Sequence, residues 1–197
     1  MKTRITGPSV GPPTLERIRQ APKVLLHDHL DGGLRPTSII ELADELGYRD
    51  LPTTDAAELS QWMLRGANRK NLTLYLETFA HTVGVMQTEA ALHRVARECA
   101  EDLAADGVVY AEIRFAPELH TERGLSLDAV IEAVLAGFDA GSTSTDLTIR
   151  VICSAMRHQN NGLDVAQVAV RYRDHGVVAF DIAGPEDGFP PDDHLVA

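Results

Sequence analysis

Cysteine is scarce in this chain of 197 residues, in which Cys99 and Cys153 are the two present. Two cysteines cannot form a disulfide framework or a cysteine-rich zinc site. Long apolar runs are missing too, since no stretch approaches the roughly 18–20 consecutive apolar residues of a membrane span. The first residues, MKTRITGPSVGPP, show no apolar run behind Lys2 and Arg4, so we expect no secretory signal. These absences predict a cytoplasmic protein that makes no contact with a membrane.

Positive charge is also in short supply. The 18 Lys and Arg residues face 29 Asp and Glu residues, which gives a net charge of −11. Nucleic-acid binding depends on a basic face that neutralises phosphates, and no Lys/Arg cluster is present to supply one. An anionic membrane surface is disfavoured for the same reason. Hydrophobic residues make up 44% of the chain, which is typical of a globular domain with a buried core.

The chain divides by composition into a lead-in and one domain. Gly and Pro predict a flexible lead-in over residues 1–13, and residues 14–197 are expected to be the N-terminal part of a single domain. Apolar runs then alternate with helical patterns, which is typical of βαβ units around a parallel sheet. Strands are expected near residues 24–30, 108–115, 147–154 and 177–182, and helices over residues 15–20, 36–46, 72–83, 88–107, 126–138 and 163–175. Such units form a small open sheet or half of an eight-stranded barrel, and the pattern leaves both open.

The sharpest motif is His27-Asp28-His29-Leu30-Asp31 at the end of the first predicted strand. Side chains alternate along a strand, so His27, His29 and Asp31 are expected on one face, with Asp28 and Leu30 on the other. Two imidazoles on one face can bind a single zinc ion. Two histidines at this spacing also occur by chance or as polar groups of a core. The position at the carboxyl end of a first strand, where barrel active sites gather, favours a metal site.

Five segments in order resemble the adenosine deaminase family of the amidohydrolase superfamily. They are PKVLLHDHLDGGLRP, LYLETF, VVYAEIRFAP, AMRHQ and VVAFDIAGPE, which together extend over nearly the whole chain after the lead-in. The resemblance is to the N-terminal half of a bacterial adenosine deaminase. It implies an α/β fold, the first half (about four βα units) of a TIM (β/α)8 barrel, with extra helices between strands one and two.

The resemblance also implies a function and a set of roles. The function is the zinc-dependent hydrolytic deamination of adenosine and deoxyadenosine to inosine and ammonia, in purine nucleoside metabolism. His27 and His29 would be ligands of one Zn²⁺ ion. His29 and Asp31 would bind the ribose side of a purine nucleoside, with Asp31 at the 5′-hydroxyl. Gly184 would offer its backbone N–H to a ring nitrogen, a role that suits a residue without Cβ; a simple turn after the strand is the alternative.

Other residues of the same segments have a structural explanation as well. Leu72, Tyr75, Leu76 and Phe79 form one helical stripe, which by spacing alone predicts core packing; the resemblance implies the apolar lining of the nucleoside pocket. Tyr110, Glu112 and Arg114 share one face of the second strand, where Glu112 and Arg114 are expected to form an interior ion pair. His158, just past the third strand, is expected to be structural.

The family's remaining catalytic motifs are not in this sequence. They are a His-Ala-Gly-Glu motif, a later His and an Asp-Asp pair, and after Gly184 the chain contains one histidine, His194, with no Ala-Gly-Glu behind it. The resemblance therefore implies an incomplete, inactive fragment whose first and fourth strands are open edges. The alternatives are a non-catalytic half-barrel or interaction module, and another His-x-His amidohydrolase such as an adenine deaminase. Adenosine is favoured over adenine because Asp31 offers a partner for the 5′-hydroxyl.

Overall fold

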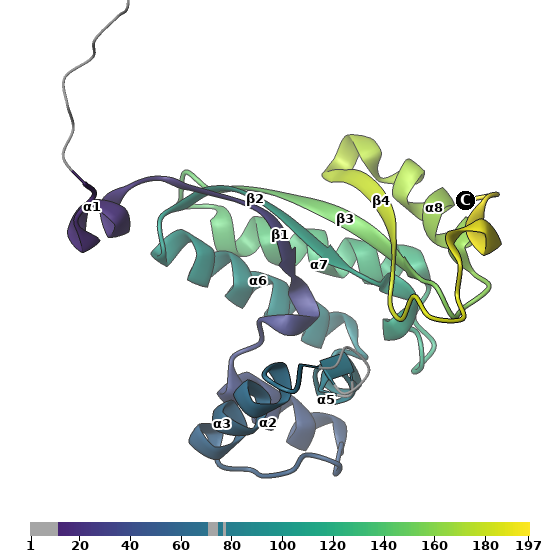
Figure 1. Cartoon of the computed structure of the whole chain (residues 1–197), viewed down its shortest axis with the longest axis horizontal. Helices are drawn as coiled ribbons and strands as arrows, with labels where there is room; N and C mark the ends of the chain where they lie inside the picture. Colours follow the sequence, from purple (N-terminus) through teal and green to yellow (C-terminus); the bar gives the residue numbers. More distant parts are fainter. Residues whose placement is uncertain (1–11, 71–74, 77) are drawn as a thin grey trace, which may run out of the picture.

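A parallel four-stranded sheet forms the centre of the molecule (Figure 1). The computed structural model describes residues 12–70, 75, 76 and 78–197. The strands lie side by side in chain order and are β1 (Lys23–His29), β2 (Val108–Phe115), β3 (Thr148–Met156) and β4 (Val177–Ala183). The four predicted strands and the α/β class are confirmed. Of the predicted lead-in, residues 1–11 lie outside the described residues.

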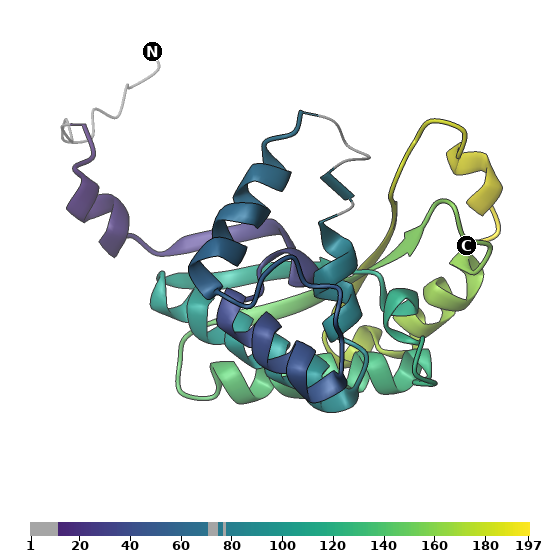
Figure 2. The same cartoon turned by 90° about the horizontal axis from the view of Figure 1, so that it is seen from below.

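Three helices cover one face of this sheet (Figures 1 and 2). They are α6 (Glu89–Ala105), α7 (Leu127–Ser142) and α8 (Gly162–Arg171), each between two successive strands. Thr88 and Ser126 fix where the first two begin, because their hydroxyls accept hydrogen bonds from the backbone N–H groups of Ala91 and Ala129. Such N-caps satisfy amide groups that a helix leaves unpaired at its start.

The core lies between these helices and the sheet. Ala111, Ile113 and Phe115 of β2 are buried on the helix side, and they alternate with the more accessible side chains of Tyr110, Glu112 and Arg114 on the other side. Tyr110, Glu112 and Arg114 therefore share one face, as the sequence predicts. On this second face Val24 and Leu26 of β1 remain 60% and 57% exposed. Among the described strands, β1 and β4 each pair with one neighbour and form the sheet edges.

The contact between α6 and α7 depends on glycine. A Cβ atom on Gly137 would lie 2.3 Å from the carbonyl oxygen of His93 and 2.7 Å from the Cβ of Ala96. Both distances are shorter than van der Waals contact, and one of the partners is rigid backbone. The two helices therefore approach as closely as they do because Gly137 has no side chain.

We expect Gly137→Ala to destabilise the protein by about 1–3 kcal/mol through overpacking, although alanine favours a free helix by about 1 kcal/mol. Urea denaturation followed by circular dichroism measures the change. The exposed Ala140 on the same helix provides the control, since Ala140→Gly changes helix propensity alone. An increase in stability for Gly137→Ala would contradict the close contact.

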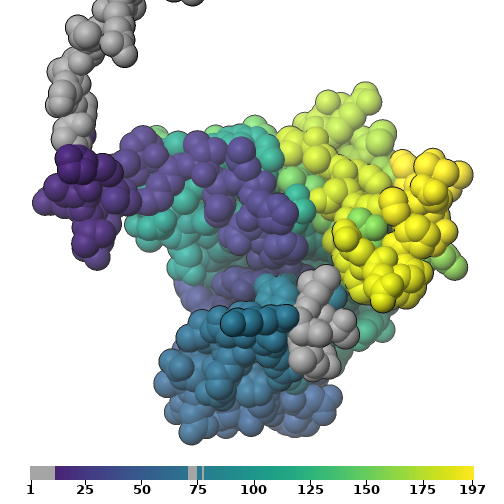
Figure 3. Space-filling view, in the orientation of Figure 1, coloured from purple at the N-terminus to yellow at the C-terminus, as the bar shows by residue number. Residues whose placement is uncertain are grey.

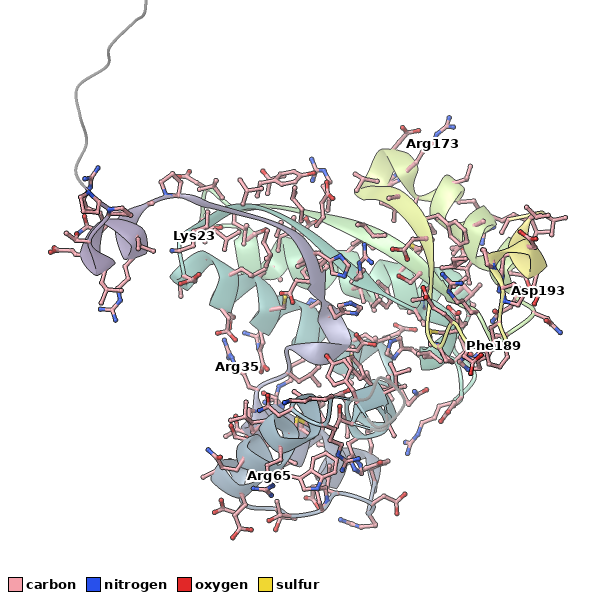
Figure 4. The ribbon with its side chains drawn as sticks, in the orientation of Figure 1. Lys23, Arg35, Arg65, Arg173, Phe189 and Asp193 are labelled. Carbon is pink, nitrogen blue, oxygen red and sulfur yellow. The ribbon has the colours of Figure 1, made fainter. Side chains whose placement is uncertain are left out.

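A second group of helices stands beyond the carboxyl end of β1. We call α2 (Pro36–Leu46), α3 (Ala56–Ala67) and α5 (Phe79–Val85) the helical insert. It follows β1 in the chain and lies below the sheet in Figure 1, and in Figure 2, which is seen from below, it lies in front of the strands. Arg35, at the start of α2, binds Asp102 and Glu101 of α6, and Arg94 of α6 binds Glu41 of α2. These ion pairs connect the insert to the layer beneath the sheet, as the position of Arg35 in Figure 4 shows.

Two of the predicted helices lie outside the layer that covers the sheet. Of the helix predicted over residues 72–83, residues 72–74 and 77 lie outside the described residues. Tyr75 and Leu76 are helical as predicted, but Thr78 forms a turn, so that the helix is not continuous and α5 begins at Phe79. The N–H and the hydroxyl of Thr78 both donate to the carbonyl oxygen of Tyr75, and a threonine hydroxyl bound this way competes with helical pairing. The predicted helix at residues 15–20 is confirmed as α1 (Leu15–Gln20). In the described part of the chain, no helix is long and apolar enough to cross a membrane.

Candidate functional site

A cavity of about 640 Å³ opens at the carboxyl ends of the strands, between the helical insert and the segment that follows β4. Figure 3 shows that segment, in yellow, at the right of the molecule and the insert, in blue, at the bottom. The volume is in the range of small-molecule sites. Its described lining is His29, Asp31, Tyr75, Leu76, Phe79, Ala80, Val83, Phe115, Ala116, Leu119, Ser154, Met156, His158, Ala183, Gly184, Pro185 and Phe189.

The two histidines of the His-x-His motif lie together at the end of β1. Their ring centroids are 5.5 Å apart and the rings are tilted by 47°. A register shift in β1, where Leu25 pairs with Ala111 and Asp28 with Ile113, places one extra residue in this stretch. Burial, the nearby charge of Arg114 and His27 together lower the pKa of His29. The neutral imidazole that a metal ligand needs is therefore favoured.

The donor set fits zinc in kind, since neutral imidazole is a preferred ligand. His27 and His29 could supply two ligands from adjacent positions. Over the residues that the structure describes, no group of three or more His, Cys, Asp and Glu side chains is placed to hold a metal ion. A catalytic zinc site uses about three protein ligands plus water, so the two histidines account for part of such a site.

Asp31 differs from its predicted position. The strand ends at His29, and Leu30–Gly32 form a 3₁₀ turn, so the prediction that Asp31 continues the strand face is wrong. The turn nevertheless brings the Oδ1 atom of Asp31 to 3.8 Å from the Nδ1 atom of His29. Asp31 is buried, which raises its pKa to about 6. Its Oδ1 has no hydrogen-bond partner within the described structure, so it can accept a hydrogen bond from a ligand.

Gly184 lies on the opposite wall, directly after β4. Its φ is +99°, a conformation that favours glycine. A Cβ atom there would come within 3.0 Å of the Met156 Cε atom and 3.7 Å of the His158 Nδ1 atom. Glycine therefore serves both the turn and the cavity, because any side chain would fill space that a ligand can use.

The apolar stripe lines this cavity instead of the core. Tyr75, Leu76 and Phe79 all contribute to the lining, while Leu72 lies outside the described residues. The rings of Tyr75 and Phe79 are perpendicular with centroids 5.2 Å apart, and the Phe79 ring is 6.3 Å from that of His29. Core packing, which the spacing alone predicts, is wrong for these three side chains. They form an aromatic wall beside the histidines.

The ion pair expected between Glu112 and Arg114 is also wrong. The Nη1 atom of Arg114 lies 2.9 Å from the Oδ2 atom of Asp181 on β4. Glu112 instead accepts a hydrogen bond of 2.8 Å from the hydroxyl of Tyr110. The pairing was unpredictable from one strand because Asp181 reaches Arg114 across β3.

Much of the lining is not predicted by the sequence patterns. Phe115, Leu119, Met156 and Phe189 are among the additional apolar residues that line it. His158, expected to be structural, also lines the cavity and its ring lies 6.0 Å from that of Phe189. The available signal was position, since ligands in such folds bind at the carboxyl ends of strands. All of these residues end a predicted strand or lie in the segment that follows one.

Arg157 fixes the segment that carries Phe189. Its guanidinium lies 3.3 Å from Glu186 and donates to the carbonyl oxygen of Phe189 at 3.4 Å. Its own carbonyl oxygen lies 3.1 Å from the Nε2 atom of His194. Phe189 is thereby fixed at the turn beyond β4, where Figure 4 labels it.

Buried polar side chains behind the lining connect its walls. Gln87 donates to the carbonyl oxygens of Val83 and Leu119 at 2.9 and 2.8 Å. Glu118 accepts a hydrogen bond of 2.7 Å from the backbone N–H of Met156. His120 is fully buried, with its Nδ1 atom 3.0 Å from the carbonyl oxygen of Met86. The helical insert, the end of β2 and the end of β3 are thus joined by hydrogen bonds.

Burial lowers the pKa of His120 to about 4 from 6.5. The unfolded chain therefore takes up a proton below pH 6.5 that the folded chain takes up near pH 4. The contribution of His120 to the free energy of unfolding is complete above pH 6.5. It falls as the pH decreases towards 4, by about 3 kcal/mol in total. We expect His120→Asn, which retains a donor near the Nδ1 position, to remove this part of the pH dependence. Urea unfolding at about pH 7 and about pH 5 measures it, with the exposed His175→Asn as control; equal slopes for the wild type and His120→Asn would contradict it.

Solved structures of other proteins are similar to this fold. Arabidopsis ADAL complexed with IMP has a TM-score of 0.78 and 26% identity, over 92% of this chain and 55% of that chain. The adenine deaminase of Arthrobacter aurescens has a TM-score of 0.74 and 27% identity, over 88% and 52% respectively. The fold is therefore half of an amidohydrolase barrel of the deaminase type, as the sequence predicts.

The relatives in sequence are closer. A family model described as adenosine deaminase matches residues 22–196. The adenosine deaminase of Mycolicibacterium gilvum is 60% identical over 191 residues, which are 94% of this chain and 53% of that protein. The chain belongs to the adenosine deaminase family. It spans about half the length of the curated relatives it matches.

Proposed function

We propose that this chain contributes the nucleoside-binding half of a zinc-dependent enzyme that deaminates adenosine and deoxyadenosine to inosine and ammonia. One observation carries the proposal. A single cavity gathers His29, Asp31 and Gly184 from the two edges of the sheet, and the aromatic wall of Tyr75 and Phe79 lines it beside His29. The cavity offers a flat apolar surface for a purine ring and polar groups at both ends.

The cavity suits an uncharged nucleoside better than a nucleotide. Its described lining contains the buried carboxyl of Asp31 and neither Lys nor Arg. A 5′-phosphate near this carboxyl would lack a cationic partner, and phosphate binding in proteins depends on such partners. The ribose hydroxyls of a nucleoside, in contrast, can donate to Oδ1 of Asp31, which has no hydrogen-bond partner among the described residues. We therefore expect adenosine to be preferred over its 5′-monophosphate.

His27 and His29 would supply two ligands of the zinc ion. When bound, zinc lowers the pKa of a water molecule and so generates a nucleophile at neutral pH. The chain's own residues bind and orient the nucleoside. Asp31 accepts a hydrogen bond from the 5′-hydroxyl. The backbone of Gly184 lies against the purine ring, and Phe79 packs against the apolar face of that ring. The purine would thereby be presented with its reactive carbon towards the histidines.

The test is deamination by this chain joined to the part of the Mycolicibacterium gilvum relative that it does not cover. Inosine and ammonia are measured with adenosine, its 5′-monophosphate and adenine as parallel substrates. We expect adenosine to have the highest kcat/KM of the three. A preference for adenine would favour the adenine deaminase alternative, and binding of a protein partner without turnover would favour the interaction module.

A further inference from the structure

We propose that Arg114 and Asp181 form a charge-balanced pair that sets the metal affinity of the His27–His29 site. Arg114 weakens the binding of a cation there and Asp181 strengthens it. The inference rests on the metal site of the proposed function. It assigns to two side chains outside the cavity lining an influence on that site through charge.

Arg114 is placed beside His29 by the sheet itself. Its neighbours Ile113 and Phe115 point towards the helices, so Arg114 projects from the opposite face of β2. In the register of β1 and β2, Arg114 is the direct partner of His29. Partners in adjacent strands lie about 5 Å apart at their backbones. The side chain of Arg114 therefore starts beside His29 and extends from there towards Asp181 on β4.

Asp181 balances the charge of Arg114 from β4, at the opposite edge of the sheet from β1. It lies on β4, in register with Ser154 of β3, and reaches across to Arg114 with an Nη1–Oδ2 distance of 2.9 Å. The side chains of Arg114 and Asp181 are 17% and 30% exposed. Charges that are mostly shielded from water act over longer distances than charges on an open surface.

The hydrogen bonding of the pair argues against a purely stabilising role. Arg114 Nε, Asp181 Oδ1 and Ser154 Oγ are all buried without a hydrogen-bond partner in the described structure. An ion pair that serves stability alone gains most when every buried donor and acceptor is satisfied. The pair therefore lacks the hydrogen bonding that stability alone would favour, and its charges remain able to act on a cation bound at the histidines.

The two charges must act on a bound cation with opposite signs. Removal of Arg114 takes away a repulsion and leaves the carboxylate of Asp181 uncompensated. Removal of the charge of Asp181 leaves the guanidinium uncompensated. Both changes break the same ion pair, so both are expected to lower the thermal unfolding temperature. Both changes should lower stability, but one should raise and the other should lower the affinity for the metal. This combination distinguishes the proposed role from a structural one.

The experiment measures Zn²⁺ affinity of the 197-residue chain by competition with a fluorescent chelator. Binding that persists in the His27→Ala/His29→Ala variant is subtracted. At an effective dielectric constant of about 20–40 we expect Arg114→Met to tighten Zn²⁺ binding about tenfold and Asp181→Asn to weaken it about tenfold. The double variant should return to within about threefold of the wild type. Arg114→Gln serves as a second neutral variant, and Arg114→Lys, which keeps the charge, should resemble the wild type.

Arg150→Met is the matched control. Arg150 projects from β3 in register with Glu112, two residues towards the amino end of β2 from Arg114. It should change metal affinity much less than Arg114→Met. Weaker binding in both Arg114→Met and Asp181→Asn, or unchanged binding in both, overturns the inference while the metal site stands. Equal zinc binding by the wild type and the His27→Ala/His29→Ala variant overturns the metal site itself, and the inference with it.

Discussion

Replacing both His27 and His29 with alanine should abolish stoichiometric zinc and deamination together in the chain joined to the remainder of its relative. The two rings lie 5.5 Å apart at the end of β1, so both changes empty one side of the same site. Loss of a metal that generates the nucleophile should lower kcat on the order of a thousandfold or more. Zinc is measured by elemental analysis after dialysis, and turnover by inosine formation.

The matched control is His175→Ala, since His175 is exposed and follows α8 far along the chain. It should retain both zinc and turnover. Stoichiometric zinc in the His27→Ala/His29→Ala variant would contradict the ligand assignment. Loss of activity with zinc retained would indicate that these histidines bind the substrate and not the metal.

Asp31→Ala should lower kcat/KM for adenosine far more than kcat/KM for 5′-deoxyadenosine. Asp31 is buried beside His29, and its Oδ1 atom, which has no hydrogen-bond partner in the part of the chain that the structure describes, can accept a hydrogen bond. Loss of a hydrogen bond to a charged group costs roughly 1.5–3 kcal/mol, which is about ten- to a hundredfold in kcat/KM. The substrate that lacks the 5′-hydroxyl never makes this bond, so its kcat/KM should change little.

Asp31→Asn is the matched variant, because it keeps the shape and an acceptor oxygen while it removes the charge. We expect an intermediate loss for adenosine. Equal losses on adenosine and 5′-deoxyadenosine for Asp31→Ala would show that this residue does not bind the 5′ end.

The sequence predicted the features that depend on local pattern. Apolar runs marked the four strands, and Thr88 marked the start of α6 because its side chain caps the helix within three residues. The two histidines of β1 were predicted to be neighbours because strand geometry fixes residues two apart on one face. All of these follow from residues close together in the chain.

The features that were mispredicted depend on distant contacts or on competition between alternatives. The partner of Arg114 is Asp181, which is set by the register of three strands. Asp31 leaves the strand because the chain turns directly after His29, which the alternation of side chains does not reveal. The aromatic residues Tyr75 and Phe79 have helical spacing, but only the position of the insert decides whether such a stripe faces a core or a cavity.

The most direct test of the proposed site is a crystal structure of the joined chain with an unreactive purine nucleoside bound. The account predicts the nucleoside in the cavity between the helical insert and β4, with its ring at the backbone N–H of Gly184 and its 5′-hydroxyl at Asp31. The ring would pack against Phe79. A nucleoside bound elsewhere, or bound in this cavity with its ribose towards Gly184 and away from Asp31, would contradict it.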